Sequence, residues 1–273
     1  MHIEARAASP AAVEALLALP VDAVGIGQEG CLAKLPDRDT LRTLAERVRT
    51  AGKDVTIVLP AAWERGADAV LDAALAVAED GPTTVTANDF GTMVSLHQAA
   101  PAHTTVAAGL ALTQVRVHAA DGTTPSAGSA EVDSASLNLL TGMGVRTAEV
   151  DSTADTTGLH GWRVRQVLGA VPLGWARSCP TARHHDLAPP DCVDRCDTPI
   201  MITAHQRWVL NHGQREALPV TARRSQPTMT VFGNGVYLAT PADPTGAHDV
   251  VVDTRFTTAA ELSDLVGALA ASR

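Results

Sequence analysis

The sequence predicts an α/β protein of the TIM-barrel-like (β/α) type, with a barrel that is irregular or incomplete in its C-terminal third. Short β-type runs alternate with amphipathic helical segments through the first half of the chain, which is typical of parallel βαβ units. The number of these units favours a barrel. A length of 273 residues, 45% of them hydrophobic, supplies one sizeable core and suits a barrel of roughly 250 residues, although two smaller domains would also fit. No linker is evident, so we expect a single domain over residues 1–273.

The first half carries the clearest alternation. Val21–Gly27 is a β-type run that ends in glycines, and residues 39–51 then place four apolar side chains on one helical face before Gly52 stops the helix. The pattern continues with predicted strands at 54–60, 83–87 and 104–109 and with helices over 63–79 and after 88–91.

The second half is less regular. Residues 118–134 are rich in Gly, Ser, Thr and Asp and predict a loop or lid, whereas residues 177–199 hold three cysteines without periodicity. Gly233-Asn234-Gly235 predicts a hairpin turn. The remaining predicted elements are helices over 135–143 and 258–271 and strands near 146–150, 162–168, 201–203, 208–210, 229–232 and 250–253.

Charge and hydropathy exclude several functions. The net charge of −9 and the pI near 5.5 provide no field to attract a polyanion, so nucleic-acid binding is disfavoured. Every apolar run is interrupted well before the ~20 residues that a membrane helix needs. The first residues, Met1–Glu4, lack the layout of a secretory signal. We therefore expect a cytoplasmic protein with reduced thiols. Its four cysteines are then expected to be metal ligands or catalysts rather than disulfide partners.

The four cysteines carry the clearest chemical pattern. Cys31 follows the first predicted strand, where a barrel presents its functional loops, and Cys179, Cys192 and Cys196 fall in the irregular segment. Four thiolates satisfy an iron–sulfur cluster or a zinc ion. Zinc sites usually use two close pairs, whereas one Cys-x₃-Cys pair and two single cysteines occur here. An iron–sulfur cluster, zinc and unrelated thiols all remain open on spacing alone.

The residues around these cysteines resemble the peptidase U32 family, and its UbiV branch most closely. The resemblance extends over roughly residues 20–215 and includes all four cysteines. The stretches that carry it are Val24–Cys31, Ala87–Gly91, Val167–Leu173, Ala176–Arg183, Cys192-x₃-Cys196 and Val209–Asn211 with Gln214.

The resemblance implies a TIM-barrel-like fold and a 4Fe–4S cluster on Cys31, Cys179, Cys192 and Cys196. It further implies oxygen-independent hydroxylation of an aromatic small molecule, a prephenate-type oxygen donor and a heterodimer with a UbiU-like sister protein. Hydroxylation of an RNA base and a non-catalytic, metal-stabilised partner subunit are alternatives. Pro180 beside Cys179 departs from the family pattern, and no Ser-His-Asp order or His-Glu-x-x-His motif supports a peptidase.

Three further residues are candidates for the site. Asp89 lies between a strand and a helix, where it either serves the pocket or caps the helix. Arg183 either binds an anionic donor through paired hydrogen bonds or forms a salt bridge to Asp186 or Asp191. His205 flanks a predicted strand as a weaker pocket candidate, with Asn211, and the remaining candidates, each with a surface or core alternative, are His184, His185, Trp175 and Trp208.

Overall fold

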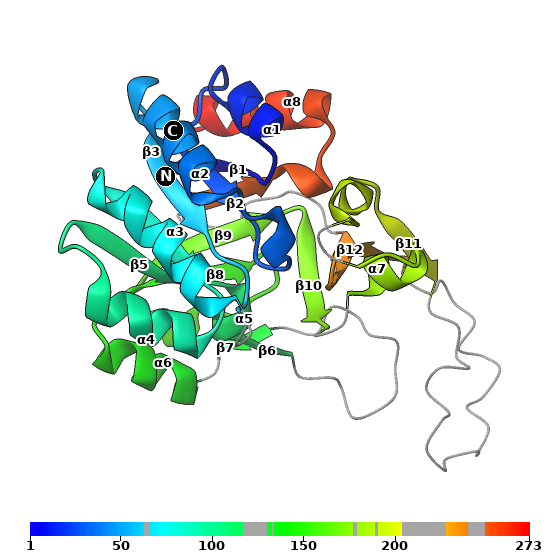
Figure 1. The fold of residues 1–273 in the computed structure, drawn as a ribbon. Coiled ribbons are helices and arrows are strands. Elements are labelled where there is room, and N and C mark those ends of the chain that lie inside the picture. Colours follow the sequence, from blue (N-terminus) through cyan, green and yellow to red (C-terminus); the bar gives the residue numbers. More distant parts are fainter. Residues whose placement is uncertain are drawn as a thin grey trace, which may run out of the picture.

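A computed structural model describes residues 1–62, 66–116, 130–132, 134–176, 179–188, 191–203, 228–239 and 249–273. Eight parallel strands close into a barrel, which confirms the predicted fold class (Figure 1). Around the barrel the order is β1-β2-β3-β4-β5-β8-β9-β14, and β14 closes it by pairing with both β1 and β9. The barrel is therefore complete in its C-terminal part. The strands are β1 (Ile3–Ala7), β2 (Ala23–Gly27), β3 (Asp54–Val58), β4 (Thr83–Ala87), β5 (Thr104–Ala108), β8 (Thr147–Asp151), β9 (Arg163–Leu168) and β14 (Asp249–Asp253).

Helices cover most of the outside of the barrel. Their apolar faces pack on the outward side chains of the strands in one large core. After β8 the long helix is replaced by the single turn η2 (Thr157–Leu159). None of the helices in the described ranges is long and apolar enough to span a bilayer. The helices are α1 (Pro10–Leu16), α2 (Arg38–Thr50), α3 (Ala67–Glu79), α4 (Phe90–Ala99), α5 (Leu110–Thr113), α6 (Ser134–Gly142) and α8 (Ala259–Ala271).

Helix ends follow the expected capping chemistry. Asp37 accepts hydrogen bonds from the first turn of α2, and Thr258 forms a capping box with Glu261 at the start of α8. Each cap satisfies amide groups that the helix itself leaves unpaired. These polar residues therefore fix where the helices begin.

The strand that begins the barrel was missed by the sequence analysis. β1 precedes the Val21–Gly27 run, so that run forms the second barrel strand, and Cys31 follows the second strand rather than the first. The reason is that Glu4 and Arg6 alternate with alanines in β1, and a charged segment does not resemble a strand that is buried on both faces. All five residues of β1 are nevertheless buried, because the charged side chains fill the barrel interior.

An antiparallel sheet is inserted between β9 and β14. It is ordered β10-β13-β12-β11, and Phe232 pairs with Gly235 across the predicted hairpin turn. The segment predicted to be irregular contains the short helix α7 (Pro180–His184) and the 3₁₀ helix η3 (Val193–Asp197). In Figure 1, α7, β11 and β12 lie to one side of the barrel. The inserted strands are β10 (Ala170–Trp175), β11 (Ile200–Thr203), β12 (Thr228–Phe232) and β13 (Gly235–Ala239), and a separate pair, β6 (Gln114–Arg116) and β7 (Ala130–Val132), precedes α6.

The barrel interior holds a compact network of charged side chains. Arg6 donates to Glu149 at 2.6 Å and to Glu4 at 3.0 Å. Arg165 pairs with the same two carboxylates, and Thr56 donates to Glu4 at 2.5 Å. The four charged side chains are at most 6% exposed. Two positive and two negative charges therefore neutralise one another where barrels usually pack branched apolar side chains.

Removal of one charge from this network is expected to destabilise the fold. In Glu149→Gln, Arg6 and Arg165 lose one of the two carboxylates that both of them contact, at a cost of about 3 to 5 kcal/mol. The matched control is Asp72→Asn, because the Arg38–Asp72 pair is exposed at both ends and is worth about 1 kcal/mol or less. Urea unfolding at neutral pH measures both, and equal losses would contradict a dominant role for the buried network.

The network also predicts a stability loss in acid. Burial alone would raise the pKa of Glu4, but the charges of Arg165 and Arg6 and the Thr56 hydroxyl outweigh it and lower the pKa. A carboxyl with a lowered folded pKa contributes stability above its unfolded value of about 4.3, and this contribution disappears as the pH falls. The unfolding free energy should therefore decrease below pH 5. The decrease should be less steep for the variant Glu4→Gln than for the surface variant Glu46→Gln.

Candidate functional site

The four cysteines lie on two parts of the chain that meet at the carboxyl end of the barrel. Cys31 follows β2 and immediately precedes η1 (Leu32–Lys34). Cys179 caps the start of α7, and Cys192 and Cys196 lie at the start of η3 and within it. The loops after β2 and β9 both leave the carboxyl end of the barrel, which is where barrels of this type carry their sites.

The side chains of the cysteines lie near one another. Cys31 and Cys196 interact directly, and Cys179 and Cys192 lie close enough for their charges to act on Cys196. The Cys196 thiol donates to the Cys192 carbonyl at 3.7 Å. A side chain added at Gly233, in the turn between β12 and β13, would lie 3.7 Å from Cys31 Cβ and 3.9 Å from Cys196 Sγ. The hairpin turn therefore lies against two of the four cysteines. All four are free thiols.

The thiols differ in their acidity. The neighbouring Cys196 thiol lowers the pKa of Cys31 to about 6 despite partial burial, and the backbone amides of Ala33 and Lys34 and the Lys34 charge act in the same direction. The interaction with Cys31, together with burial and the neighbouring thiolates, raises the pKa of Cys196. Burial likewise raises the pKa of Cys192. Cys31 thus ionises before Cys192 and Cys196.

Polar contacts hold the two parts of the site together. Lys34, three residues after Cys31, donates to Asp197, the residue after Cys196, at 2.8 Å. The Thr181 hydroxyl in α7 donates to the carbonyl of Gly233 at 3.0 Å, and α7 packs against η3 and β12. The cysteine-bearing segments are therefore linked to each other through the hairpin and through an ion pair.

The donor set determines which group the site could hold. Within the described ranges, no three His, Cys, Asp or Glu side chains are arranged to hold a metal ion. A zinc ion needs every thiolate within about 2.3 Å. A four-iron cluster also takes four cysteine thiolates, but it spreads them around a larger body. By their chemistry, four thiols are the donor set of a four-iron cluster and equally of a structural zinc ion.

Asp89 has a structural role in the described contacts. Its carboxylate accepts from the Thr92 amide at 2.7 Å and from the Thr92 hydroxyl at 2.8 Å, and so caps α4. It also accepts from the Ala62 amide at 2.9 Å. These contacts correspond to the capping alternative, and a role in the pocket remains a prediction.

The basic candidates near Cys179 are exposed. Arg183 lies on the outer side of α7, and no ion pair joins it to Asp186, to Asp191 or to another residue of the described segments. His184 and His185 are both exposed at the end of α7, and their ring centroids are 4.9 Å apart. His205, Trp208, Asn211 and Gln214 lie outside the described residues.

Trp175 lies at the carboxyl mouth of the barrel. Its ring packs against Leu110, Val167 and Val251, the last two from the barrel strands β9 and β14. Gly30 also lies beside it, since a Cβ there would come within 3.7 Å of the indole ring. The indole N–H is buried and has no hydrogen-bond partner in the described part of the chain. Trp175 is thus a partly buried residue that packs against the core and borders the Cys31 loop.

A second charged cluster near Cys31 was missed by the sequence analysis. Glu29 accepts from the Tyr237 hydroxyl at 2.8 Å and from Arg255 Nη2 at 2.8 and 2.7 Å. Arg255 also pairs with Asp253 at 2.6 Å. No spacing in the sequence connects residues 29, 237 and 255, and the only indication was a charged residue between glycines after a buried strand.

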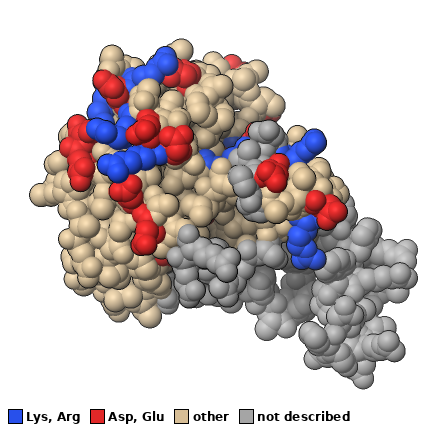
Figure 2. Space-filling model, in the orientation of Figure 1, with Lys and Arg blue, Asp and Glu red and all other residues tan. Residues whose placement is uncertain are grey.

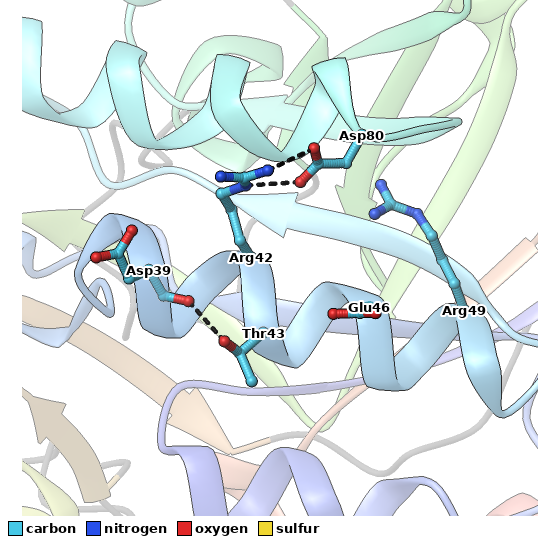
Figure 3. Close-up of a pocket in the computed structure, with 6 residues that line it drawn as sticks. All are labelled: Asp39, Arg42, Thr43, Glu46, Arg49 and Asp80. Carbon is cyan, nitrogen blue, oxygen red and sulfur yellow. Dashed lines mark hydrogen bonds and ion pairs between the residues drawn. The ribbon is translucent and has the colours of Figure 1, made fainter.

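A surface groove between two of the helices is unrelated to the cysteines. It has a volume of about 470 Å³ and lies over α2 and the end of α3 (Figure 3). Arg42 and Asp80 form a paired hydrogen bond in it at 2.7 Å for both contacts. Lysine, arginine and acidic side chains are interspersed over this region in Figure 2, without a continuous basic stripe on that face. The groove is therefore a surface salt-bridge region between two helices. Its lining residues are Asp39, Arg42, Thr43, Glu46, Arg49 and Asp80.

The fold and site define a (β/α)₈ barrel protein with four cysteines at its carboxyl end. No protein-family model matches the chain, and no curated protein matches it. Among solved structures it is similar to the U32 peptidase Mk0906, with 11% identity and a TM-score of 0.47, covering 93% of this chain and 92% of that one. It is also similar to a truncated form of 3-deoxy-D-arabino-heptulosonate 7-phosphate synthase from Thermotoga maritima, with 11% identity and a TM-score of 0.28 over 56% of this chain and 64% of that one.

The cluster around Tyr237 provides a spectroscopic prediction, because Tyr237 is the single tyrosine of the chain. Burial, followed by the charge of Glu29, raises the pKa of its hydroxyl. A raised folded pKa means that stability falls as the pH rises above the ordinary value of about 10. Tyrosinate absorbance should therefore appear together with the loss of circular dichroism in an alkaline titration. A tyrosinate signal from protein that is still folded would show that the hydroxyl is not held by Glu29.

Proposed function

We propose that the protein holds a 4Fe–4S cluster and takes part in oxygen-independent hydroxylation of an aromatic small molecule, as a U32-family protein closest to the UbiV branch. The observation that carries this proposal is that four free cysteines lie on loops at the carboxyl end of a (β/α)₈ barrel. The ligands would be Cys31, Cys179, Cys192 and Cys196. Four cysteine thiolates are the usual ligand set of such a cluster.

The residues around the cysteines suit a buried, charged group. Lys34 and the amides of Ala33 and Lys34 stabilise a thiolate at Cys31. Trp175 packs on apolar side chains at the barrel mouth and lies beside the Cys31 loop. A cluster would supply one-electron transfer at this position.

The oxygen donor and substrate are proposed by chemical class. Arg183 is exposed and without an ion pair in the described segments, so its guanidinium is available for the carboxylate of a prephenate-type donor. The aromatic substrate is a quinone precursor or a natural-product intermediate. We propose a UbiU-like sister protein as the partner subunit of a heterodimer.

A second candidate function is support of that sister subunit without catalysis. Four protein thiolates occupy all four iron corners of a cubane cluster, which leaves no iron free to bind a reactant. This arrangement favours electron transfer or a structural role for this chain. Hydroxylation of an RNA base is less favoured, because the net charge is −9.

The deciding measurement is iron, sulfide and zinc per chain after purification without oxygen, together with an absorption spectrum. We expect about four iron and four sulfide per chain, lost in Cys31→Ser and Cys179→Ser and kept in the exposed control Val94→Ser. One zinc without sulfide would contradict the redox function and leave a metal-stabilised barrel. Free thiols in a folded chain without metal would contradict both the cluster and the metal-stabilised barrel.

A further inference from the structure

The loop that carries Cys31 is attached to the rest of the molecule at two points. Glu29 lies two residues before the cysteine and Lys34 three residues after it. Lys34 reaches Asp197, beside Cys196, at 2.8 Å, and its side chain is only 8% exposed. Glu29 is directed the other way, toward β13 and the end of β14. The loop is thus held on both sides of the thiol.

The Glu29 attachment is the more deeply buried of the two. Its carboxylate accepts three hydrogen bonds, one from the Tyr237 hydroxyl and two from Arg255. The Glu29 side chain is 4% exposed and that of Arg255 is 14% exposed. A carboxylate that is removed from water needs such partners, so the loop is stable in this position only while both donors are present.

The two donors are themselves fixed by packing. Tyr237 packs with Phe232 and Phe256 in an aromatic cluster, and the Arg255 guanidinium lies over the rings of Tyr237 and Phe256 at 5.4 and 5.0 Å. A Cβ at Gly235 would come within 2.4 Å of the Tyr237 hydroxyl oxygen, so only glycine leaves room for it there. The donors therefore occupy one position relative to the barrel.

The same hairpin contacts Glu29 through Tyr237 and borders Cys31 and Cys196 through its turn. Tyr237 lies on β13, which follows directly on the turn whose Gly233 borders Cys31 and Cys196. The hydroxyl that holds Glu29 and the turn that borders the two cysteines thus belong to one hydrogen-bonded hairpin. A shift of the Cys31 loop relative to Cys196 would require the loss of the Glu29 contacts.

We propose that Tyr237 and Arg255 are positioning residues that act through Glu29 to hold the Cys31 thiol beside Cys196, in the place where it serves as a ligand. Neither residue contacts a cysteine in the described contacts. The ligand role of Cys31 rests on the proposed function, whereas the position of its thiol does not.

The test uses Tyr237→Phe and Arg255→Lys, alone and together, in the full chain purified without oxygen. Tyr237→Phe keeps the aromatic packing and removes one hydrogen bond, and Arg255→Lys keeps the charge and removes the paired geometry. The matched control is Arg42→Lys, which breaks a paired Arg–carboxylate contact on the far helices α2 and α3. Circular dichroism confirms that each variant is folded, and Tyr237→Phe remains informative if Arg255→Lys does not fold.

Two rates are measured. The first is the loss of iron to a chelator, expected to be about tenfold faster in the double variant, since loss of an outer hydrogen-bond partner weakens metal sites by roughly 10- to 100-fold. The second is the alkylation of each thiol by iodoacetamide in metal-free protein, followed by peptide mass spectrometry. Alkylation should accelerate severalfold at Cys31 and stay unchanged at Cys179, and Arg42→Lys should change neither rate.

The outcomes separate this inference from the proposed function. Iron in the unmodified protein with unchanged rates in the folded variants would overturn the positioning role and leave the cluster proposal standing. Faster alkylation of Cys31 in a protein that never holds iron would support the positioning role and contradict the cluster. Equal acceleration at all four thiols would indicate general loosening of the fold and would also overturn the inference.

Discussion

The buried charge network inside the barrel is the constraint on which the rest of the structure depends. Arg6 and Arg165 each contact both Glu4 and Glu149, and these residues come from three strands, β1, β8 and β9. Taking four charges out of water is costly, and that cost is offset only while all four are in contact. The strands that carry them must therefore take one register in the closed barrel.

This network also explains the small residues of β2. A Cβ at Gly25 would come within 2.7 Å of the Glu4 carboxylate and within 3.2 Å of Arg6. β2 thus leaves space for the charged side chains of its neighbour. The same strand continues into Gly27, whose φ of +110° turns the chain toward Glu29 and Cys31. The packing inside the barrel and the start of the cysteine loop are therefore joined in one short strand.

Charge continues from the barrel interior toward the cysteines. Asp253 acts on Arg6 within the barrel and pairs with Arg255 at its mouth. Arg255 holds Glu29, and Glu29 leads into Cys31. Alternating positive and negative groups thus extend from the core of the fold to one of the four thiols. This continuity places paired charges beside the Cys31 loop at the mouth of the barrel.

The sequence by itself determined the elements whose side chains follow a simple period. The predicted strand at 83–87 and the helices at 39–51 and 258–271 match β4, α2 and α8 within a residue, because local apolar spacing and capping fix such elements. It also indicated the four cysteines as one group, through their residue type and the resemblance to a family. β1 and the Glu29–Tyr237–Arg255 cluster could be identified only in the tertiary structure. Their charged side chains are buried by partners that are far away in the chain, and no local sequence pattern predicts a contact between residues 29 and 255. For Asp89, local chemistry allowed two roles, and the contacts of Thr92 and Ala62 with its carboxylate are those of a helix cap.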